Sequence, residues 1–459
     1  MSPVTEHFDA IVIGAGQAGP PLAGRLTEAG QTVAVIERKL VGGTCVNYGC
    51  IPTKTLVASA HAAHLARRGA DYGIGTGDVA VDMAKVKARK DKIMLDDRHG
   101  VESWLQGMAG CTFIRGHARF TDPHTVDVDG RILTADRVFL NVGGRAVAPD
   151  LPGLADIDYL TNVGILELDT VPEHLVIIGG SYIALEFAQM YRRFGAEVTV
   201  IEKGPRLTSR EDEDVSATVR EVLEAEGIAI IVGAGDMRFT KQDNGFEVIP
   251  HDGADAVSGT HLLVAVGRVP NTDDLGLDAA GVQTDERGYV VVDDQLRTTA
   301  EHIWAMGDCN GKGAFTHTSY NDFEIVAANL LDDDPRRVSD RITTYALYID
   351  PPLGRAGMSV DQVRASGRKA LVGKRPMTRV GRAVEKGETQ GFMKVVVDAE
   401  TEEILGAAIF GVGGDEVIHS ILDVMTAKLP YTAISRTMHI HPTVSELVPT
   451  LLQDLKPLS

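Results

Sequence analysis

Two cysteines separated by four residues, Cys45 and Cys50, are the residues best suited to chemistry in this chain. A disulfide between them would close a very small loop and add little stability, because the entropy gained grows with loop size. Such a bond is better explained as a reversible electron carrier. Zinc would need two further ligands, and Cys111 and Cys309 show no paired spacing. The pair therefore predicts thiol–disulfide redox chemistry.

The segment ahead of the cysteines has the pattern of a dinucleotide-binding βαβ unit. Gly14, Gly16 and Gly19 follow an apolar strand and open a helix. Glycines there allow a tight turn, close approach of a pyrophosphate and helix–strand packing, and the helix N-terminus binds the phosphates. Glu37 ends the next strand, where a carboxylate can bind ribose hydroxyls. An empty α/β unit would also contain a glycine turn, but the strand, helix and acid in register favour a nucleotide site.

The same pattern recurs between Val176 and Lys203. The first glycine precedes the acidic residue by 23 positions in both copies, from 14 to 37 and from 179 to 202. Ser181 stands where a second glycine is expected in the later copy. Two βαβ units predict two dinucleotide-binding domains with parallel sheets.

The acid at the end of the second copy bears on nicotinamide choice. Glu202 would repel a 2′-phosphate, so we expect NADH to be favoured over NADPH. Arg206 and Arg210 lie near enough in sequence to weaken that preference. We interpret the acidic run Glu211–Asp214 as a solvated helix start, because acidic side chains stabilise a helix N-terminus.

The chain changes character near Arg341. The apolar runs 392–397 and 404–410 flank a polar turn and predict a hairpin. Apolar residues at 418, 421, 422 and 425 then share one helical face. We expect an α+β domain in this region.

Composition limits the classes of partner. The chain has 459 residues, which is too long for one core, and a formal net charge of -19. An acidic surface repels phosphate backbones and anionic lipid, so we expect neither nucleic acid nor membrane as a partner. The N-terminal MSPVTEHFDA is unlike a secretory signal, and the expected location is the cytoplasm.

Five segments together resemble a known family. They are Gly14–Gly19, the Cys45–Cys50 segment, the second nucleotide motif, Ile303–Asp308 and His441–Glu446. The chain is similar to the FAD-containing pyridine nucleotide–disulfide oxidoreductases of the glutathione reductase, dihydrolipoamide dehydrogenase and mercuric reductase group. The resemblance covers nearly the whole chain.

The resemblance implies roles for particular residues. Cys50 would lie nearest the flavin as a thiolate, and Cys45 would meet the substrate. Lys54 would sit beside flavin N5 with Glu186 as its partner. His441 and Glu446 would form an acid–base dyad that serves the partner subunit's thiols, and Tyr182 would cover the nicotinamide pocket. The expected cofactor-binding residues are Gly14, Gly16, Gly19, Glu37, Gly43, Thr44, Gly144, Gly307 and Asp308 for FAD, and Gly179, Tyr182, Glu202 and Gly267 for the nicotinamide dinucleotide.

The expected fold class is therefore α/β, with two Rossmann-like dinucleotide-binding domains and a C-terminal α+β dimerisation domain. We expect an FAD-binding domain over residues 1–150 completed by 266–338, a NAD(P)-binding domain over 151–265, and an interface domain over 339–459 that forms a homodimer with shared active sites.

The expected activity is NAD(P)H-dependent, FAD-dependent reduction of a small disulfide or related acceptor through Cys45 and Cys50. Quinone or metal-ion reduction is the alternative, and a redox sensor without turnover is a second one. No motif distinguishes glutathione, dihydrolipoamide or another disulfide. Because the sequence shows no C-terminal cysteine pair, we expect weak Hg(II) reduction. No chemistry is assigned to Cys309, and Cys111 is interpreted as a small buried hydrophobe.

Overall fold

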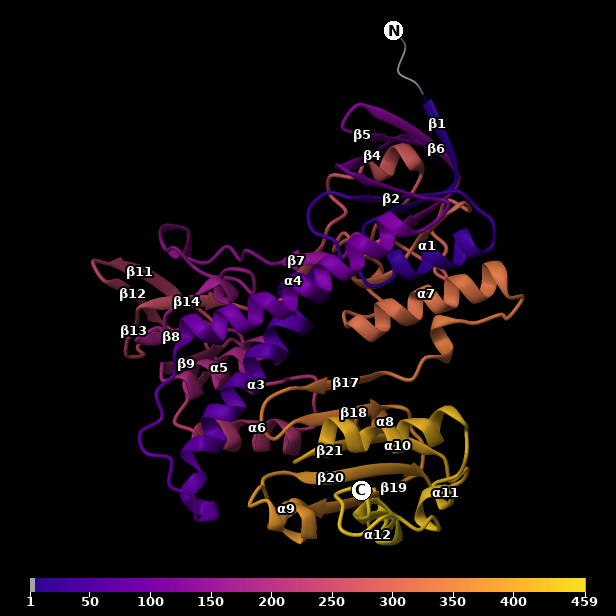
Figure 1. Cartoon of the computed structure of the whole chain (residues 1–459). Helices are drawn as coiled ribbons and strands as arrows, with labels where there is room; N and C mark the ends of the chain where they lie inside the picture. Colours follow the sequence, from indigo (N-terminus) through magenta and orange to yellow (C-terminus); the bar gives the residue numbers. More distant parts are fainter. Residues whose placement is uncertain (1–4, 459) are drawn as a thin grey trace.

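The computed structural model describes residues 5–458, whose three largest sheets are one mixed, one parallel and one antiparallel sheet (Figure 1). Residues 1–4 and 459 lie outside the described part. The expectations drawn from MSPVTEHFDA and from the C-terminal end fall partly on them.

The first sheet contains the earlier βαβ unit. β1 (Thr5–Ile13) and β2 (Val33–Glu37) are parallel neighbours in the sheet, and α1 (Gly19–Glu28) connects them along the chain. Residues Ala10–Ile13 are almost fully buried, as expected for a parallel strand covered on both faces. The full order is β3-β2-β1-β6-β5-β4, with β16 beside β6. The remaining strands are β3 (Cys111–Arg115), β4 (Ala118–Asp122), β5 (Thr125–Val128), β6 (Arg131–Leu140) and β16 (Ile303–Ala305).

Three helices follow β2, and the first two carry the cysteine pair. α2 (Gly43–Tyr48) contains Cys45, and Cys50 is the first residue of α3 (Cys50–Arg67). α4 (Met83–Gly107) returns to β3. Leu56 and Ala60 of α3 share a hydrophobic core with helix α5 (Tyr182–Phe194) of the second unit. This core fixes the cysteine-bearing helix against the second nucleotide unit.

The second sheet repeats the βαβ arrangement in the order β10-β9-β8-β14. β8 (His174–Ile178), α5 (Tyr182–Phe194) and β9 (Glu197–Glu202) form the predicted unit. An antiparallel ribbon, β7 (Gly144–Ala146) with β15 (Arg268–Pro270), joins the places where the chain leaves and re-enters the first unit. The other elements of this unit are α6 (Glu213–Ala225), β10 (Ala229–Val232), β11 (Arg238–Gln242), β12 (Gly245–Ile249), β13 (Val257–Gly259) and β14 (His261–Val264). α7 (Thr316–Leu331) follows β16 along the chain and shares a hydrophobic core with α1 of the first unit.

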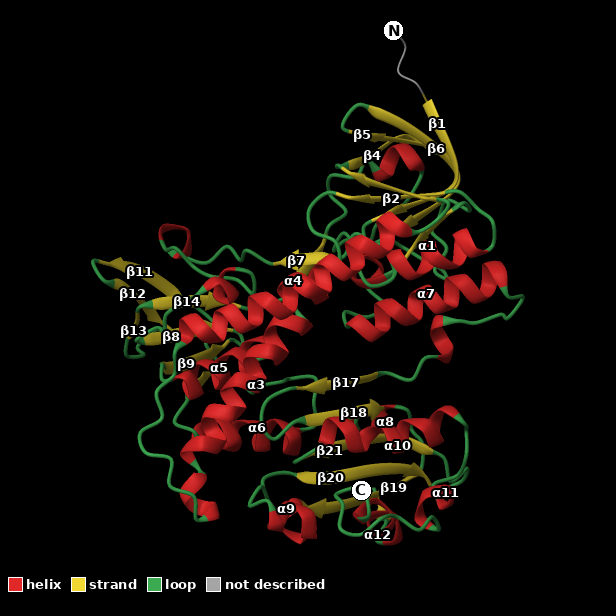
Figure 2. Ribbon diagram, viewed as in Figure 1, coloured by secondary structure: helices red, strands yellow, loops and turns green. Residues whose placement is uncertain are grey.

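The third unit is an antiparallel sheet with short helices around it (Figure 2). The predicted hairpin is β20 (Phe392–Asp398) with β21 (Ile404–Phe410), and the predicted helix is α10 (Gly414–Thr426). The sheet order is β17-β18-β21-β20-β19-β22. The remaining elements are β17 (Thr344–Leu347), β18 (Leu353–Gly357), α8 (Val360–Ala365), β19 (Ala370–Pro376), α9 (Gly381–Glu385), α11 (Thr432–Ser435), α12 (Leu447–Gln453) and β22 (Lys456–Pro457).

Among the helices in residues 5–458, none combines the length and apolarity needed to cross a bilayer.

Candidate active site

The first glycine loop is packed so closely that side chains cannot replace its glycines. Gly14 has a φ of 106°, and a Cβ there would lie 2.3 Å from the carbonyl oxygen of Asn141. A Cβ on Gly19 would lie 2.3 Å from the Gly14 oxygen, and one on Gly43 would lie 2.9 Å from Cα of Gly16. The loop therefore presents bare backbone at the N-terminus of α1, which suits a pyrophosphate.

Asn141 is a residue of this site that the sequence reasoning missed. Its buried side chain accepts a hydrogen bond from Gly19 N at 3.1 Å and donates to Met306 O at 3.1 Å. It therefore ties the glycine loop to the segment that contains Asp308. The signal available in the sequence was a polar residue directly after the apolar end of a strand.

Glu37 lies at the mouth of the glycine turn. Its carboxylate accepts hydrogen bonds from Ala15 N at 2.9 Å and from Lys39 N at 2.7 Å. These contacts hold the carboxylate at the end of β2, where it can meet ribose hydroxyls.

Asp308 forms the centre of a second group around the same loop. Burial raises the pKa of its carboxyl, and the guanidinium of Arg268 opposes that rise. Arg268 Nη2 lies 3.4 Å from Asp308 Oδ2, 3.4 Å from Thr44 Oγ1 and 2.5 Å from Gly144 O. Arg268 thus connects three of the predicted FAD residues, and the sequence reasoning stopped one residue short of it, at Gly267.

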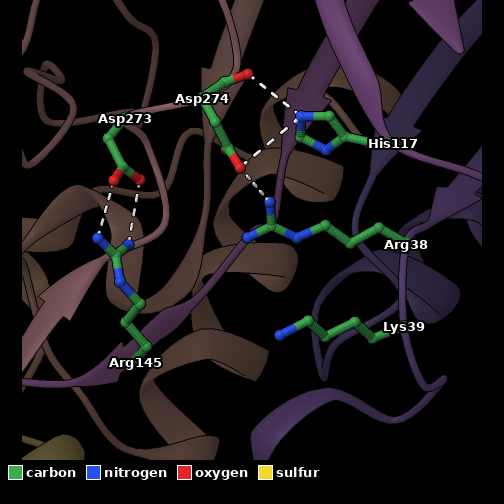
Figure 3. Close-up of a pocket in the computed structure, with 6 residues that line it drawn as sticks. All are labelled: Arg38, Lys39, His117, Arg145, Asp273 and Asp274. Carbon is green, nitrogen blue, oxygen red and sulfur yellow. Dashed lines mark hydrogen bonds and ion pairs between the residues drawn. The ribbon is translucent and has the colours of Figure 1, made fainter. Parts of the chain in front are cut away.

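An open pocket of about 500 Å³ lies beyond the end of β2 (Figure 3). Arg38 pairs with Asp274 at 2.5 Å, and Arg145 pairs with Asp273 at 2.8 Å. The drawn side chain of Lys39 has no dashed contact to the others in Figure 3. Arg38, Lys39 and Arg145 form the cationic part of the pocket lining. Because Arg38 follows Glu37 directly, we infer that these side chains lie at the ribose end of the first nucleotide site.

The second glycine turn repeats the geometry of the first. Gly179 has a φ of 117°, and a Cβ there would lie 2.5 Å from Ala265 O. Glu202 accepts hydrogen bonds from Gly180 N at 2.5 Å and Gly204 N at 2.6 Å. Gly267 also has a positive φ, of 138°. The two nucleotide loops are therefore built alike, down to the strand-end carboxylate.

The cysteines are both thiols in the structure, which is the reduced form of the pair. Cys45 donates a hydrogen bond to the sulfur of Cys50, which lowers the pKa of Cys50 to about 6 despite the opposing effect of burial, with further help from Thr316 and Lys54. The same interaction raises the pKa of Cys45. Cys50 Sγ lies 3.2 Å from Thr316 Oγ1 and occupies the N-terminus of α3, which also favours a thiolate. These contacts favour the thiolate form on Cys50 over that on Cys45.

Lys54 and Glu186 come together across the two nucleotide units. Lys54 Nζ lies 2.7 Å from Glu186 Oε2, and Glu186 is buried. The other oxygen of Glu186 accepts from Tyr348 N at 3.0 Å, and Lys54 lies over the Tyr348 ring. The ammonium is thereby held one helical turn from Cys50.

His441 and Glu446 form a pair at the surface of the third unit. His441 Nδ1 lies 2.9 Å from Glu446 Oε2, and the His441 side chain is 81% exposed. Within residues 5–458, the structure brings neither residue into hydrogen-bonding contact with Cys45 or Cys50. His439 instead contacts Thr437 O. An exposed imidazole with an oriented carboxylate suits proton transfer outside its own chain.

The other two cysteines show no sign of reactivity. Burial raises the pKa of Cys309 to about 12 and that of Cys111 to about 11. Cys309 is fully buried, whereas Cys111 is only partly buried at the edge of the first sheet. Within the described residues, no group of three or more His, Cys, Asp or Glu side chains is arranged to hold a metal ion.

The interpretation of the acidic run as a solvated helix start is wrong for Glu211 and Asp212, which are 1% and 5% exposed. Glu211 Oε2 lies 3.1 Å from Arg355 Nε, and Asp212 Oδ2 lies 2.6 Å from Lys394 Nζ. The cationic partners come from the third unit, so buried ion pairs join it to the second unit here.

Two family models account for nearly all of the chain. A pyridine nucleotide-disulphide oxidoreductase model matches residues 8–322, and the dimerisation domain of the same family matches residues 343–452. RclA of Escherichia coli is 35% identical over 98% of this chain and 99% of its own. A dihydrolipoyl dehydrogenase of Cupriavidus necator is 34% identical over 97% of both chains. A mercuric reductase of Bacillus cereus is 31% identical over 96% of this chain and 70% of its own.

Solved structures agree with these sequence matches. The structure of the HOCl-induced flavoprotein disulfide reductase RclA from Escherichia coli superposes with a TM-score of 0.89, at 35% identity over 98% of this chain and 100% of that one. Its Cu(II) complex gives a TM-score of 0.89 at 34% identity, over 98% and 99%.

The fold and the thiol pair define the class of NAD(P)H-dependent flavoprotein disulfide reductases. This chain belongs to the pyridine nucleotide-disulfide oxidoreductase family. The predicted family, the α/β fold class with its C-terminal dimerisation domain, and the enzyme class are confirmed. The dimerisation domain implies that the chain pairs with a second copy.

Proposed function

We propose that this enzyme takes electrons from NADH and delivers them through Cys45 and Cys50 to a small disulfide. The observation that carries the proposal is the unequal thiol pair, in which Cys50 is the favoured thiolate at the N-terminus of α3 and Cys45 keeps its proton. For a disulfide RSSR the overall reaction is NADH + H⁺ + RSSR → NAD⁺ + 2 RSH.

The residues at the first glycine loop fit FAD. Bare glycine backbone at the start of α1 suits the pyrophosphate, Glu37 suits the adenosine ribose, and Asp308 with Arg268 suits the ribityl side. When bound, FAD would supply the step that converts a two-electron hydride donor into a reductant of the cysteine disulfide. The proposed extents are residues 1–150 with 266–338 for this unit, 151–265 for the nicotinamide unit and 339–459 for the interface.

The residues of the chain then divide the remaining work. Lys54, held by its ion pair with buried Glu186, places its ammonium near the Cys50 thiolate. His441 of the second copy, which Glu446 orients, takes the proton of Cys45, and the Cys45 thiolate attacks the acceptor, forms a mixed disulfide and releases one acceptor thiolate. Cys50 then attacks the Cys45 sulfur, regenerates the Cys45–Cys50 bond and releases the second acceptor thiolate. One released thiolate takes the proton that His441 holds, and the other takes a proton from solvent.

NADH is the proposed electron donor because Glu202, at the end of β9, would face the adenosine ribose. Arg206 is already engaged by the carbonyl oxygens of Ser209 and Glu211, at 3.2 and 3.0 Å. In this arrangement it does not offset the charge of Glu202, and a 2′-phosphate would meet the carboxylate.

Reduction of a metal ion is a second candidate, favoured by one observation. The relative RclA has been solved as a Cu(II) complex, and it matches this chain over almost its whole length. Soft thiolate ligands favour Cu(I), so a vicinal thiol pair could bind the product of a one-electron reduction.

A steady-state screen of disulfides, quinones and Cu(II) with both nicotinamides tests the proposal. We expect disulfide turnover with NADH, and its loss in Cys45→Ser with quinone reduction retained. Cu(II) turnover without any disulfide turnover would favour the second candidate. Full disulfide turnover by Cys45→Ser would contradict the proposed electron path.

A further inference from the structure

One buried carboxylate outside the cysteine centre binds Tyr182, the side chain that the family resemblance predicts to cover the nicotinamide pocket. Glu211 Oε1 accepts hydrogen bonds from the hydroxyls of Tyr182, at 2.5 Å, and Tyr345, at 2.6 Å. Its other oxygen lies 3.1 Å from Arg355 Nε. Both Glu211 and Arg355 are almost fully buried, and their contact is an ion pair that lacks hydrogen-bond geometry. The carboxylate therefore accepts the two phenol hydroxyls in charge-assisted hydrogen bonds in a dry setting.

The position of Tyr182 makes this contact functional as well as structural. Tyr182 directly follows the Gly179–Ser181 turn and begins α5, and its neighbours Ser181 and Ile183 are exposed. Burial and the Glu211 charge raise the pKa of Tyr182 far above neutrality, so its hydroxyl remains a donor throughout the working pH range. The ring therefore lies at the mouth of the second nucleotide site and is tethered by its hydroxyl.

The tether reaches the third unit and the thiol centre. Tyr345 belongs to β17, and its ring centroid lies 5.5 Å from those of both Tyr182 and Phe315. Phe315 precedes Thr316, which contacts the sulfur of Cys50. Because Tyr345 and Arg355 both come from the third unit, the position of Glu211 depends on how that unit packs against the nicotinamide unit.

We propose that Glu211 is a latch that holds Tyr182 closed over the nicotinamide pocket, with Tyr345 sharing the same carboxylate oxygen. This inference rests on the proposed function, because it takes Tyr182 as the cover of that pocket. Glu211 is a positioning residue: it acts through Tyr182 and not on the dinucleotide.

Only molecules with the latch open bind the nicotinamide, so the apparent dissociation constant is the intrinsic one divided by the open fraction. A hydrogen bond to a charged group is worth about tenfold or more in an equilibrium constant. Tyr182→Phe keeps the ring and removes the tether, so it should tighten binding. Tyr345→Phe leaves the carboxylate oxygen to Tyr182 alone, so it should weaken binding. Opposite shifts from two identical chemical changes are a signature that a merely structural cluster would not give.

The test is calorimetric titration of the oxidised holoenzyme with NAD⁺, which requires no turnover. For Tyr182→Phe we expect the dissociation constant to fall about tenfold. For Tyr345→Phe it should rise by a few fold. Tyr191→Phe is the matched control, because it removes a buried phenol hydroxyl that donates to Ile165 O at 2.8 Å, and it should bind as the wild type does.

Stopped-flow reduction of the flavin by NADH provides the second measurement. The apparent dissociation constant for NADH should fall in Tyr182→Phe and rise in Tyr345→Phe. An unchanged or weaker NAD⁺ affinity in Tyr182→Phe, or shifts in the same direction in both variants, would overturn the latch and leave the proposed function standing. A wild-type flavin that neither nicotinamide reduces would instead overturn the proposed function, and the latch with it.

Discussion

Replacing Thr316 with valine should raise the pKa of the Cys50 thiol. The Thr316 hydroxyl lies 3.2 Å from Cys50 Sγ and helps to lower that pKa to about 6. Valine keeps the shape of the side chain and removes the donor, so the charged form of the thiol loses a favourable contact. A net loss of about 1.4 kcal/mol, ordinary for one hydrogen bond, corresponds to roughly one pKa unit. The Cys50 pKa should therefore move to roughly 7.

The assay is the long-wavelength absorbance that a thiolate beside oxidised flavin produces, followed against pH in the two-electron-reduced protein. The absorbance should disappear as the pH falls through the Cys50 pKa, and its midpoint should lie higher in Thr316→Val. Thr55→Val is the control, because Thr55 lies on α3 with Cys50 but its hydroxyl donates to Ile51 O at 2.8 Å and not to sulfur. A midpoint in Thr316→Val that is unchanged or lower than wild type would refute the assigned thiolate environment.

Three further outcomes follow from other contacts. The ratio of kcat/KM values should favour NADH over NADPH by about ten- to a hundredfold, because Glu202 facing a 2′-phosphate costs about 1–3 kcal/mol; a clear NADPH preference would contradict this. Asp322→Ala should lower the thermal midpoint of unfolding and release FAD on gel filtration. Asp322 accepts a hydrogen bond from Gly307 N at 2.7 Å and pairs with Arg341, and breaking a buried pair costs about 3–5 kcal/mol. Full retention of FAD by this variant would argue against the role of Asp322. Disulfide reduction should reappear when inactive Cys45→Ser and His441→Ala chains exchange subunits, and demonstrated exchange without activity would show that the sites are not shared.

Local patterns were enough to predict the nucleotide units. The strand at Ala10–Ile13, the glycines at 14 and 19 and the acid at 37 lie within one short stretch, and each is fixed by the backbone geometry of a βαβ unit. The hairpin of β20 and β21 was equally readable, because it is continuous in sequence and mostly apolar.

Contacts between distant segments were not readable in the same way. Glu211 looks like a solvated acid at a helix start, and what buries it is Arg355 of the third unit. Arg268 and Asn141 hold the first nucleotide loop through partners far along the chain. A single sequence does not show which charges will meet, so these residues became visible only in the folded structure.

Alkylation of the cysteines before and after addition of one equivalent of NADH, read by mass spectrometry, tests the central claim most directly. If electrons pass through the pair, the oxidised protein should resist labelling at Cys45 and Cys50, and NADH should open the pair to labelling. Cys111 and Cys309 serve as internal references, since the raised pKa values of their thiols keep them protonated in both states. Equal labelling of Cys45 with and without NADH, in protein whose flavin is reduced by NADH, would contradict the account.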